Sequence, residues 1–292
     1  MKIKYSLLLI VLAIVSCQGN KEFESPNMPL WEITNSQGKS SYLLGTTEYL
    51  PNDSARILFN ELLISSFDSA EVFLTQIDLA NSDFGQTKLA LEIPDDKLMK
   101  EYLSENEFQK LQQLQKNWKY NGQNSMPAAD STRLKLVFYL HDMIYLNNQS
   151  NFYFDKFWVE RAMPLEKKIS GLETYQSYYE GFQVLSKADE VNFMNSIQSL
   201  DVFVDSLRSS SQALYMSGEF AEIHALYLSL FPYLKAHYQA MVADKHKTWA
   251  KKIGESSDSV STFVTLDVFH MVGKQNLIHE LLSKGYNVKR IQ

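Results

Sequence analysis

The sequence predicts an α/β protein built around a central mixed β-sheet. Residues 40–78 and residues 262–291 each have the pattern of a strand, a turn, a helix and a second strand. Residues 30–38, before the first of these repeats, alternate apolar and polar side chains and end in a turn signal, which predicts a hairpin at one edge of the sheet. Much of the remaining chain has apolar residues at helical spacing, so we expect many helices, about eight, to cover the sheet.

The composition supports a folded domain and argues against nucleic acid as a partner. Apolar residues make up 45% of the chain, which is enough for a substantial core. The formal net charge is −6, whereas binding to nucleic-acid phosphates requires a basic surface. We therefore expect no nucleic-acid partner.

The first 29 residues are expected to lie outside the folded domain. Residues 1–16 contain two lysines and then an apolar run that is shorter than the about 20 residues of a membrane-spanning helix, which is typical of an export signal. Residues 14–17 match the lipobox of a lipoprotein, and Cys17 is the one cysteine of the sequence. We expect a mature protein that starts at a lipidated Cys17, with residues 17–29 as a polar tether and residues 30–292 as the folded domain.

The residue after the cysteine predicts where the lipoprotein is delivered. Gln18, rather than an aspartate, follows Cys17, and by resemblance to known sorting signals this favours the outer membrane. The expected location is therefore the cell envelope, with the lipid on Cys17 as the contact to the membrane.

The first repeat presents a carboxylate at the end of its first strand. Residues 40–44 form a short apolar run, and Gly45 is expected to end this strand because glycine readily turns the backbone. Residues 52–67 combine good N-cap residues with an apolar helical face, and residues 71–77 predict a second strand parallel to the first. Ligands of open α/β sheets bind at the carboxyl ends of strands, so Glu48 is a candidate site residue.

The middle of the chain is predicted to be mainly helical, with one strand inside it. Ser104 and Glu107 have the spacing of a capping box. Residues 154–163 predict a further helix, and a short buried strand is expected to end near Gly171. Glu173 then lies at a strand end, where it is either a functional carboxylate or a charge that complements the N-terminus of the next helix.

The last part of the chain contains the second repeat and its candidate residues. Helices are expected from 187 to 254, followed by a polar linker over residues 255–261. A strand over residues 262–266 leads to a turn that contains Asp267 and His270. His270 is a candidate acid, base or metal ligand, while Asp267 either joins it in binding an ion or caps the turn, and capping is favoured.

Three other histidines are expected to have structural roles. His141, His224 and His237 all lie among core-type residues. None has a second ligand one helical turn away, whereas a metal site needs several convergent groups.

Three segments of the chain resemble the TraB/GumN family. They are residues 30–46 (LWEITNSQGKSSYLLGT), residues 167–182 (KKISGLETYQSYYEGF) and residues 270–291 (HMVGKQNLIHELLSKGYNVKRI). That family is related to the Tiki metalloproteases and to a wider fold named for erythromycin esterase and the haem-uptake protein ChaN. The resemblance covers nearly all of the mature chain and implies an α/β fold with a metal-dependent, peptidase-like hydrolase site.

The chain departs from the family pattern at several site positions. In the family, two G-x-x-H motifs and separate glutamates form the site. Here the first motif is Gly45-Thr46-Thr47-Glu48, with glutamate in place of histidine, and the second keeps His270 but has Asp267 in place of glycine. The family glutamate on the second strand falls at Gln76, whereas the glutamate of a G-L-E-T segment is kept at Glu173.

A family motif on a helix, R-N-x-x-W, is also altered. It corresponds to residues 245–249, where Lys245 and His246 replace arginine and asparagine and only Trp249 is kept. A lysine lacks the planar fork with which arginine holds a carboxylate through two hydrogen bonds. The resemblance thus makes Gly45, Gln76, Asp267, Lys245 and His246 candidates for the rim of the site.

Two functions remain open from the sequence. The altered motifs favour a divergent member, a pseudoenzyme with weakened or lost metal-dependent hydrolysis, which acts as a lipid-anchored binding domain for a peptide or protein. The alternative is an active metal-dependent hydrolase in which His270, Glu48 and Glu173 hold Mn²⁺, Co²⁺ or Zn²⁺ and the ion activates water. One histidine with several carboxylates suits a hard ion such as Mn²⁺. Without a metal, Glu173 and His270 would act as an acid/base pair.

Overall fold

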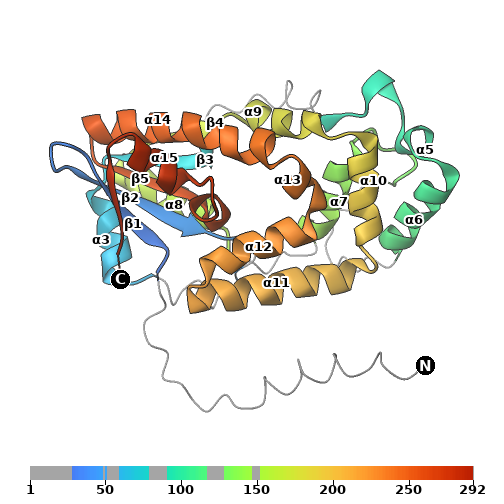
Figure 1. Ribbon diagram of the computed structural model, residues 1–292, viewed down its shortest axis with the longest axis horizontal. Helices are drawn as coiled ribbons and strands as arrows, with labels where there is room; N and C mark the ends of the chain where they lie inside the picture. The colour runs from blue at the N-terminus through green and yellow to red at the C-terminus, as the bar shows by residue number, and fades with distance from the viewer. Residues whose placement is uncertain are drawn as a thin grey trace, which may run out of the picture.

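The computed structural model describes residues 28–48, 50, 59–78, 91–116, 128–146 and 152–291. Within these residues the chain forms a six-stranded mixed sheet and twelve α-helices (Figure 1). The predicted α/β class with an N-terminal hairpin is therefore confirmed. The predicted export signal, Cys17, most of the tether and the N-cap positions 52–54 lie outside the described residues.

The strands, helices and short turns have the following bounds, each kind given in chain order. The strands are β1 (Leu30–Thr34), β2 (Ser40–Thr46), β3 (Val72–Ile77), β4 (Lys168–Glu173), β5 (Thr262–Asp267) and β6 (Asn287–Ile291). The α-helices are α3 (Glu61–Ser69), α5 (Met99–Tyr102), α6 (Glu105–Lys116), α7 (Leu136–Leu146), α8 (Phe154–Ala162), α9 (Tyr175–Glu180), α10 (Lys187–Ser196), α11 (Leu200–Ser217), α12 (Phe220–Leu230), α13 (Pro232–Ala236), α14 (Asp244–Ser259) and α15 (Leu277–Ser283). Shorter turns are η1 (Pro94–Asp96), η2 (Met163–Leu165), η3 (Gly181–Val184), the π-helical η4 (Gln239–Ala243) and η5 (Val268–Met271).

The strand order places most carboxyl strand ends at one rim of the sheet. The order is β4-β3-β5-β2-β1-β6. The pairs β2–β5, β5–β3 and β3–β4 are parallel, and β1 is antiparallel to both β2 and β6. All strands except β1 therefore run in the same direction, and β2, β3, β4 and β5 end side by side.

One feature of this order was not predicted and another differs from the prediction. The first strand of the second repeat lies inside the first repeat, because β5 is placed between β2 and β3. The N-terminal hairpin is not at the edge, because β6 pairs with β1 along residues 287–291 and becomes the edge strand itself. Both edges of the β1 backbone are thus hydrogen-bonded to neighbouring strands, as buried backbone groups require.

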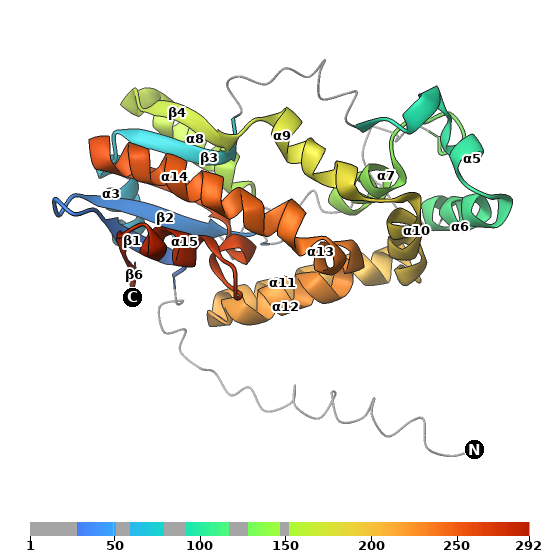
Figure 2. The same ribbon diagram turned by 45° about the horizontal axis from the view of Figure 1, so that its top comes forward.

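Helices cover both faces of the sheet. On one face, Phe67 of α3 packs against Phe73 of β3 and Phe263 of β5, with ring centroids 5.4 and 5.1 Å apart. The ring of Trp158 in α8 also packs against Phe67, with centroids 4.5 Å apart. Figure 2 shows α14 and α15 across the other face, where Trp249 of α14 is buried. The sheet is therefore the middle layer of the hydrophobic core.

The helical half of the molecule, α5 to α7 and α10 to α13, extends beyond the rim at which β2, β3, β4 and β5 end. Figure 1 shows α5, α6, α7 and α10 to α13 on the side away from β6. Phe193, Phe231 and Tyr233 pack together at its centre, with ring centroids 5.2 to 6.0 Å apart. None of the described helices is both long enough and apolar enough to cross a lipid bilayer.

The predicted linker over residues 255–261 is mostly helix. α14 continues to Ser259, where the hairpin between β1 and β2 covers its last carbonyl groups. Asn35 Nδ2 donates to the Ser257 carbonyl oxygen at 3.2 Å, and Lys39 Nζ donates to that of Ser259 at 2.6 Å. These tertiary hydrogen bonds stabilise the end of a polar helix that its sequence alone does not favour.

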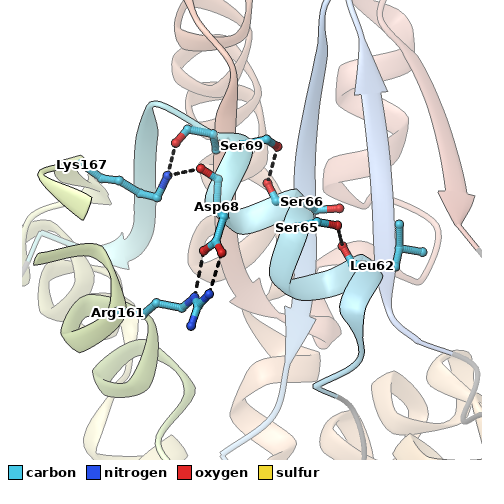
Figure 3. A network of polar contacts seen from close by, with 8 residues as sticks. Leu62, Ser65, Ser66, Asp68, Ser69, Arg161 and Lys167 are labelled. Atoms are coloured by element: carbon cyan, nitrogen blue, oxygen red, sulfur yellow. Dashed lines mark hydrogen bonds and ion pairs between the residues drawn. The ribbon is translucent and has the colours of Figure 1, made fainter. Parts of the chain in front are cut away.

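A polar cluster joins the end of α3 to α8 and to the start of β4. Figure 3 shows Arg161 donating to both carboxylate oxygens of Asp68, at 2.9 and 2.6 Å. Lys167 Nζ donates to the carbonyl oxygens of Asp68 and Ala70. The carbonyl groups at a helix C-terminus lack intrahelical partners, so this lysine satisfies the end of α3.

We predict that Arg161→Lys lowers the free energy of unfolding by less than about 1 kcal/mol. Lysine cannot make the two parallel hydrogen bonds, but the ion pair is about one-third exposed and solvent screens it. Urea unfolding followed by circular dichroism measures the change. Arg133→Lys is the control, because its carboxylate partner is 3.8 Å away and exposed. Equal losses in the two variants would contradict a specific role for the bidentate pair.

Candidate functional site

The ends of β2, β3 and β5 bring several predicted residues to one cavity. Glu48 follows β2, Gln76 lies near the end of β3, Asp267 ends β5 and His270 lies in η5. Together with Lys245 of α14, these side chains line a cavity of about 170 Å³. Parallel strands place their carboxyl ends at the same rim, which is why residues so distant in sequence meet here.

The other walls of this cavity are aromatic. They come mainly from the helical half, and the aromatic lining residues are Tyr178, Phe182, Tyr227, Phe231, Tyr233, Trp249 and Phe269. Phe269 stacks on His224 and Tyr227, with ring centroids 4.8 and 5.6 Å apart. The cavity therefore has a polar end at the sheet and apolar sides, as small-ligand sites commonly do.

A second cavity of about 500 Å³ lies on the other side of the same polar residues. Glu48, Gln76 and Asp267 line both cavities and form the partition between them. Asp155 of α8 lines the second cavity and accepts a hydrogen bond of 2.7 Å from Thr265 Oγ1. The site is thus a pair of adjoining hollows with carboxyl groups between them.

Glu173 does not line either cavity, because Lys245 covers it. Lys245 Nζ lies 2.8 Å from Glu173 Oε2, and the whole glutamate is 8% exposed. The same ammonium lies 5.1 Å from the ring centroid of Tyr178 and 6.0 Å from that of Trp249. Burial raises the pKa of Glu173, and the charge of Lys245 partly opposes the rise.

His246 and His270 form a buried hydrogen-bonded pair. His246 Nε2 lies 3.0 Å from His270 Nδ1, and His246 Nδ1 lies 2.8 Å from the carbonyl oxygen of Gln275. Burial lowers the pKa of His246 to about 4. Burial, followed by the charges of His246 and Lys245, lowers the pKa of His270 well below its ordinary value. Both rings are therefore neutral at physiological pH.

The carboxyl groups of Glu48 and Asp267, which lie between the two cavities, have raised pKa values. Glu48 keeps contact with solvent, but the protein around its carboxyl group, and then the charge of Asp155, raises its pKa. Burial is the main cause that raises the pKa of Asp267 to about 7, and the charges of Glu48 and Asp155 add to it. Asp267 Oδ1 also accepts a hydrogen bond of 2.8 Å from the Phe269 N–H, so the predicted turn cap is present.

Gly45 does not form the predicted turn. It lies inside β2, which continues to Thr46 because that residue still pairs with Asp267. A Cβ at Gly45 would lie 3.0 Å from Val268 Cγ2 and 3.2 Å from Met271 Sδ. Glycine is needed here for close packing of β2 against η5, so Gly45 supports the turn that carries His270 without lining the site.

Several lining residues were missed as site candidates from the sequence. Tyr178, Tyr227 and Phe269 lie on helical segments or turns whose aromatic residues look like core residues. Asp155 has a weak signal, since it lies in a predicted helix that resembles the family. The only general signal for Tyr178 is its place on the helix that follows Glu173.

The described side chains do not fit a bound metal ion as they are placed. Among them, no group of three or more histidine, cysteine, aspartate or glutamate residues is arranged to hold one. Of the ligands that the resemblance implies, Glu173 is paired with Lys245, and His270 uses Nδ1 to bond His246. Glu48 and His270 both line the cavity of about 170 Å³, whereas Glu173 does not.

Comparison with known proteins gave one match. A family model described as the TraB/PrgY/gumN family matches residues 29–290, which include β1 to β5 and all but the last residue of β6. No curated protein and no solved structure matches the chain.

Proposed function

We propose, from the premise that this chain belongs to the TraB/PrgY/gumN family, that it is a binding domain that has lost metal-dependent hydrolysis. In this proposal the domain is held at the cell envelope, at the outer membrane, by a lipid on Cys17. Its ligand is a peptide or protein segment that inserts one group into the cavity at the rim of the sheet. The family resemblance of the sequence is confirmed by the match, while the lost activity, the anchor and the ligand are the proposal.

The observation that carries this proposal is the ion pair between Lys245 and Glu173. A metal-binding glutamate must offer a carboxylate oxygen to the ion, but here an internal ammonium lies 2.8 Å from that group. The same positive charge repels an incoming divalent cation. The ammonium of Lys245 therefore pairs with Glu173, the glutamate that the family motif keeps. This pairing supports binding of an organic ligand better than metal-activated hydrolysis.

We predict that the full chain purified without chelator contains no stoichiometric metal. Elemental analysis and titration with Mn²⁺ and Co²⁺, followed by thermal unfolding, measure this. A ligand that binds only the folded state raises the melting temperature. Since we expect neither ion to bind, we expect no shift of the melting temperature.

Glu48→Ala and His270→Ala are measured beside the parent protein. One-to-one metal binding that is lost in both variants would overturn the proposal and support the active metal-dependent hydrolase. In that case Glu48 would be a replacement ligand for the family histidine.

A further inference from the structure

Aromatic side chains at the cavity of about 170 Å³ form a closed loop of contacts. Among the described residues, eight lining rings run from Tyr178 to Trp249, His270 included, and each centroid lies 4.9 to 6.3 Å from the next. The ammonium of Lys245 closes the loop, because it lies 5.1 Å from the ring centroid of Tyr178 and 6.0 Å from that of Trp249. We call these eight rings and Lys245 the aromatic belt.

Polar atoms of the belt are bonded to partners within the protein. The Tyr233 hydroxyl and His141 Nε2 form a hydrogen bond. His270 Nδ1 lies 3.0 Å from His246 Nε2. These residues therefore offer a ligand mainly the faces and edges of their rings.

The charges at the polar end of the cavity are largely balanced. The Lys245 ammonium lies 2.8 Å from Glu173 Oε2. Burial raises the pKa of Glu48 and that of Asp267, the latter to about 7, so Asp267 is mostly neutral at pH 6. An ion of either sign would be buried here without an opposite charge of its own, and such burial is costly. Lys245 in particular would repel a cation.

The space beside the belt is larger than a packed core leaves empty. Protein interiors contain few voids larger than a water molecule. The volume of about 170 Å³ is comparable to the about 150 Å³ in which an apolar cavity binds benzene. One benzene-sized ring therefore fits. It would meet the rings of the belt in the tilted and edge-to-face contacts that they make with one another.

We infer that the aromatic belt binds one uncharged aromatic ring, the side chain of a phenylalanine or tyrosine on a peptide or protein ligand. The inference rests on the proposed binding function and deepens it, because it names the group that enters the cavity. The volume and the ring contacts select an aromatic group, and the balanced charges exclude an ionised one.

Four small probes of similar size test the ring and its charge. Benzyl alcohol, cyclohexylmethanol, benzylamine and benzoate are titrated at pH 6 into the full chain in a nonionic detergent. The ¹³C-methyl NMR signal of Met241, which lines the cavity, reports binding. A probe that gives little shift by itself is measured by its competition with benzyl alcohol. The methyl signal of Met99, which is buried in α5 and does not line the cavity, is the control.

Benzyl alcohol is expected to bind at least about tenfold more tightly than benzylamine or benzoate, because each ion would be buried without a counter-charge. It should bind about threefold more tightly than cyclohexylmethanol, since contacts between rings add to the burial of apolar area. Absence of benzyl alcohol binding at Met241 would overturn the inference. Equal binding of either ion or of cyclohexylmethanol would also contradict it.

Two variants of lining residues locate the ring. Phe269→Leu keeps an apolar side chain and should fold, and it is expected to weaken benzyl alcohol about threefold more than cyclohexylmethanol. Leu234→Phe adds a ring at the cavity and is expected to weaken benzyl alcohol by at least about tenfold, because the space is then occupied.

The matched controls make the same exchanges outside the cavity. They are Phe108→Leu in α6 and Leu282→Phe in α15, and both should leave the affinity unchanged. Full affinity for benzyl alcohol in both lining variants, or equal losses in the controls, would overturn the assignment of the ring to this cavity.

Blocked peptides test the source of the ring. A glycine pentapeptide with a central phenylalanine is expected to compete with benzyl alcohol at Met241. The same peptide with a central leucine should compete about threefold less well. Binding of benzyl alcohol without competition by the phenylalanine peptide would overturn the peptide as the source and indicate a free aromatic molecule.

These results separate the inference from the proposed function. Metal binding in the titration with Mn²⁺ and Co²⁺ would overturn the loss of hydrolysis, whatever the aromatic ring does. Failure of benzyl alcohol to bind, with no metal bound, would overturn only the aromatic ligand.

Discussion

Gly171→Ala is expected to lower the free energy of unfolding by more than about 4 kcal/mol or to prevent folding. A Cβ at this position of β4 would lie 1.9 Å from the backbone nitrogen of Asp78 and 2.5 Å from the Ile77 carbonyl carbon. Both are backbone atoms of the segment that ends β3, so no side-chain rotation can relieve the overlap. The two strands would have to separate.

The loss would extend to the candidate site. The N–H of Asp78 donates to the Glu173 carbonyl oxygen at 2.8 Å, so the same displacement moves Gln76 and Glu173 away from the rim. Urea unfolding followed by circular dichroism measures the stability.

Gly38→Ala is the matched control for this variant. Its φ of +78° makes alanine strained by roughly 1–2 kcal/mol, but no heavy atom lies within 4 Å of the added Cβ. The control therefore measures backbone strain without a clash. Similar losses in the two variants would contradict the close approach of β3 and β4 at Gly171.

Lys245→Met is expected to lower the free energy of unfolding by about 3–5 kcal/mol at pH 8. The side chains of Lys245 and Glu173 are 16% and 4% exposed, so water screens the pair little. Removing the ammonium leaves a buried carboxylate with no cation beside it. Urea unfolding at several pH values measures the effect.

The pH dependence of this loss has a defined sign. The pKa of Glu173 is raised in the folded protein, so its protonated form is the one that folding favours. Its contribution is fully present below the unfolded pKa of about 4.5 and is lost as the pH rises through the folded pKa. Without Lys245 the folded pKa rises further, because the charge that lowered it is gone. The difference from the parent should therefore be smallest near pH 4 and largest above neutrality.

Two further variants identify the cause. The double variant Lys245→Met, Glu173→Gln should recover part of the stability at pH 8, since the neutral amide needs no cation. Lys251→Met serves as the control, because that lysine is exposed and lies 3.8 Å from Glu255. A loss in Lys245→Met that does not vary with pH would mean that packing, and not charge, explains it.

Local sequence patterns predicted the strands and helices better than they predicted the order of the strands in the sheet. Half of the predicted capping box is present, with the Ser104 N–H donating to Glu107 Oε2 at 2.7 Å. The strands of both repeats were located to within one or two residues. The number of helices was underestimated, because the long helical stretch after residue 187 is divided into α10 to α14. Breaks of this kind depend on packing between helices, which periodicity does not report.

The candidate site was predicted as a set of strand ends, to which the family resemblance added Lys245 and His246. Glu48 and His270 follow strands in the sequence, and parallel strands bring such residues to one rim. Their partners were not predictable. The bond from His246 to His270 and the ion pair from Lys245 to Glu173 both depend on how α14 crosses the sheet.

By itself, the sequence determined the α/β class, the strands and the family, because apolar spacing, turn residues and short motifs act over a few neighbouring residues. The tertiary structure alone decided that β5 inserts between β2 and β3, that β6 closes the edge, and that Glu173 lies behind Lys245 instead of on the cavity surface. Those outcomes depend on contacts between residues far apart in the chain, where the free energy comes from burial and charge pairing of the whole fold.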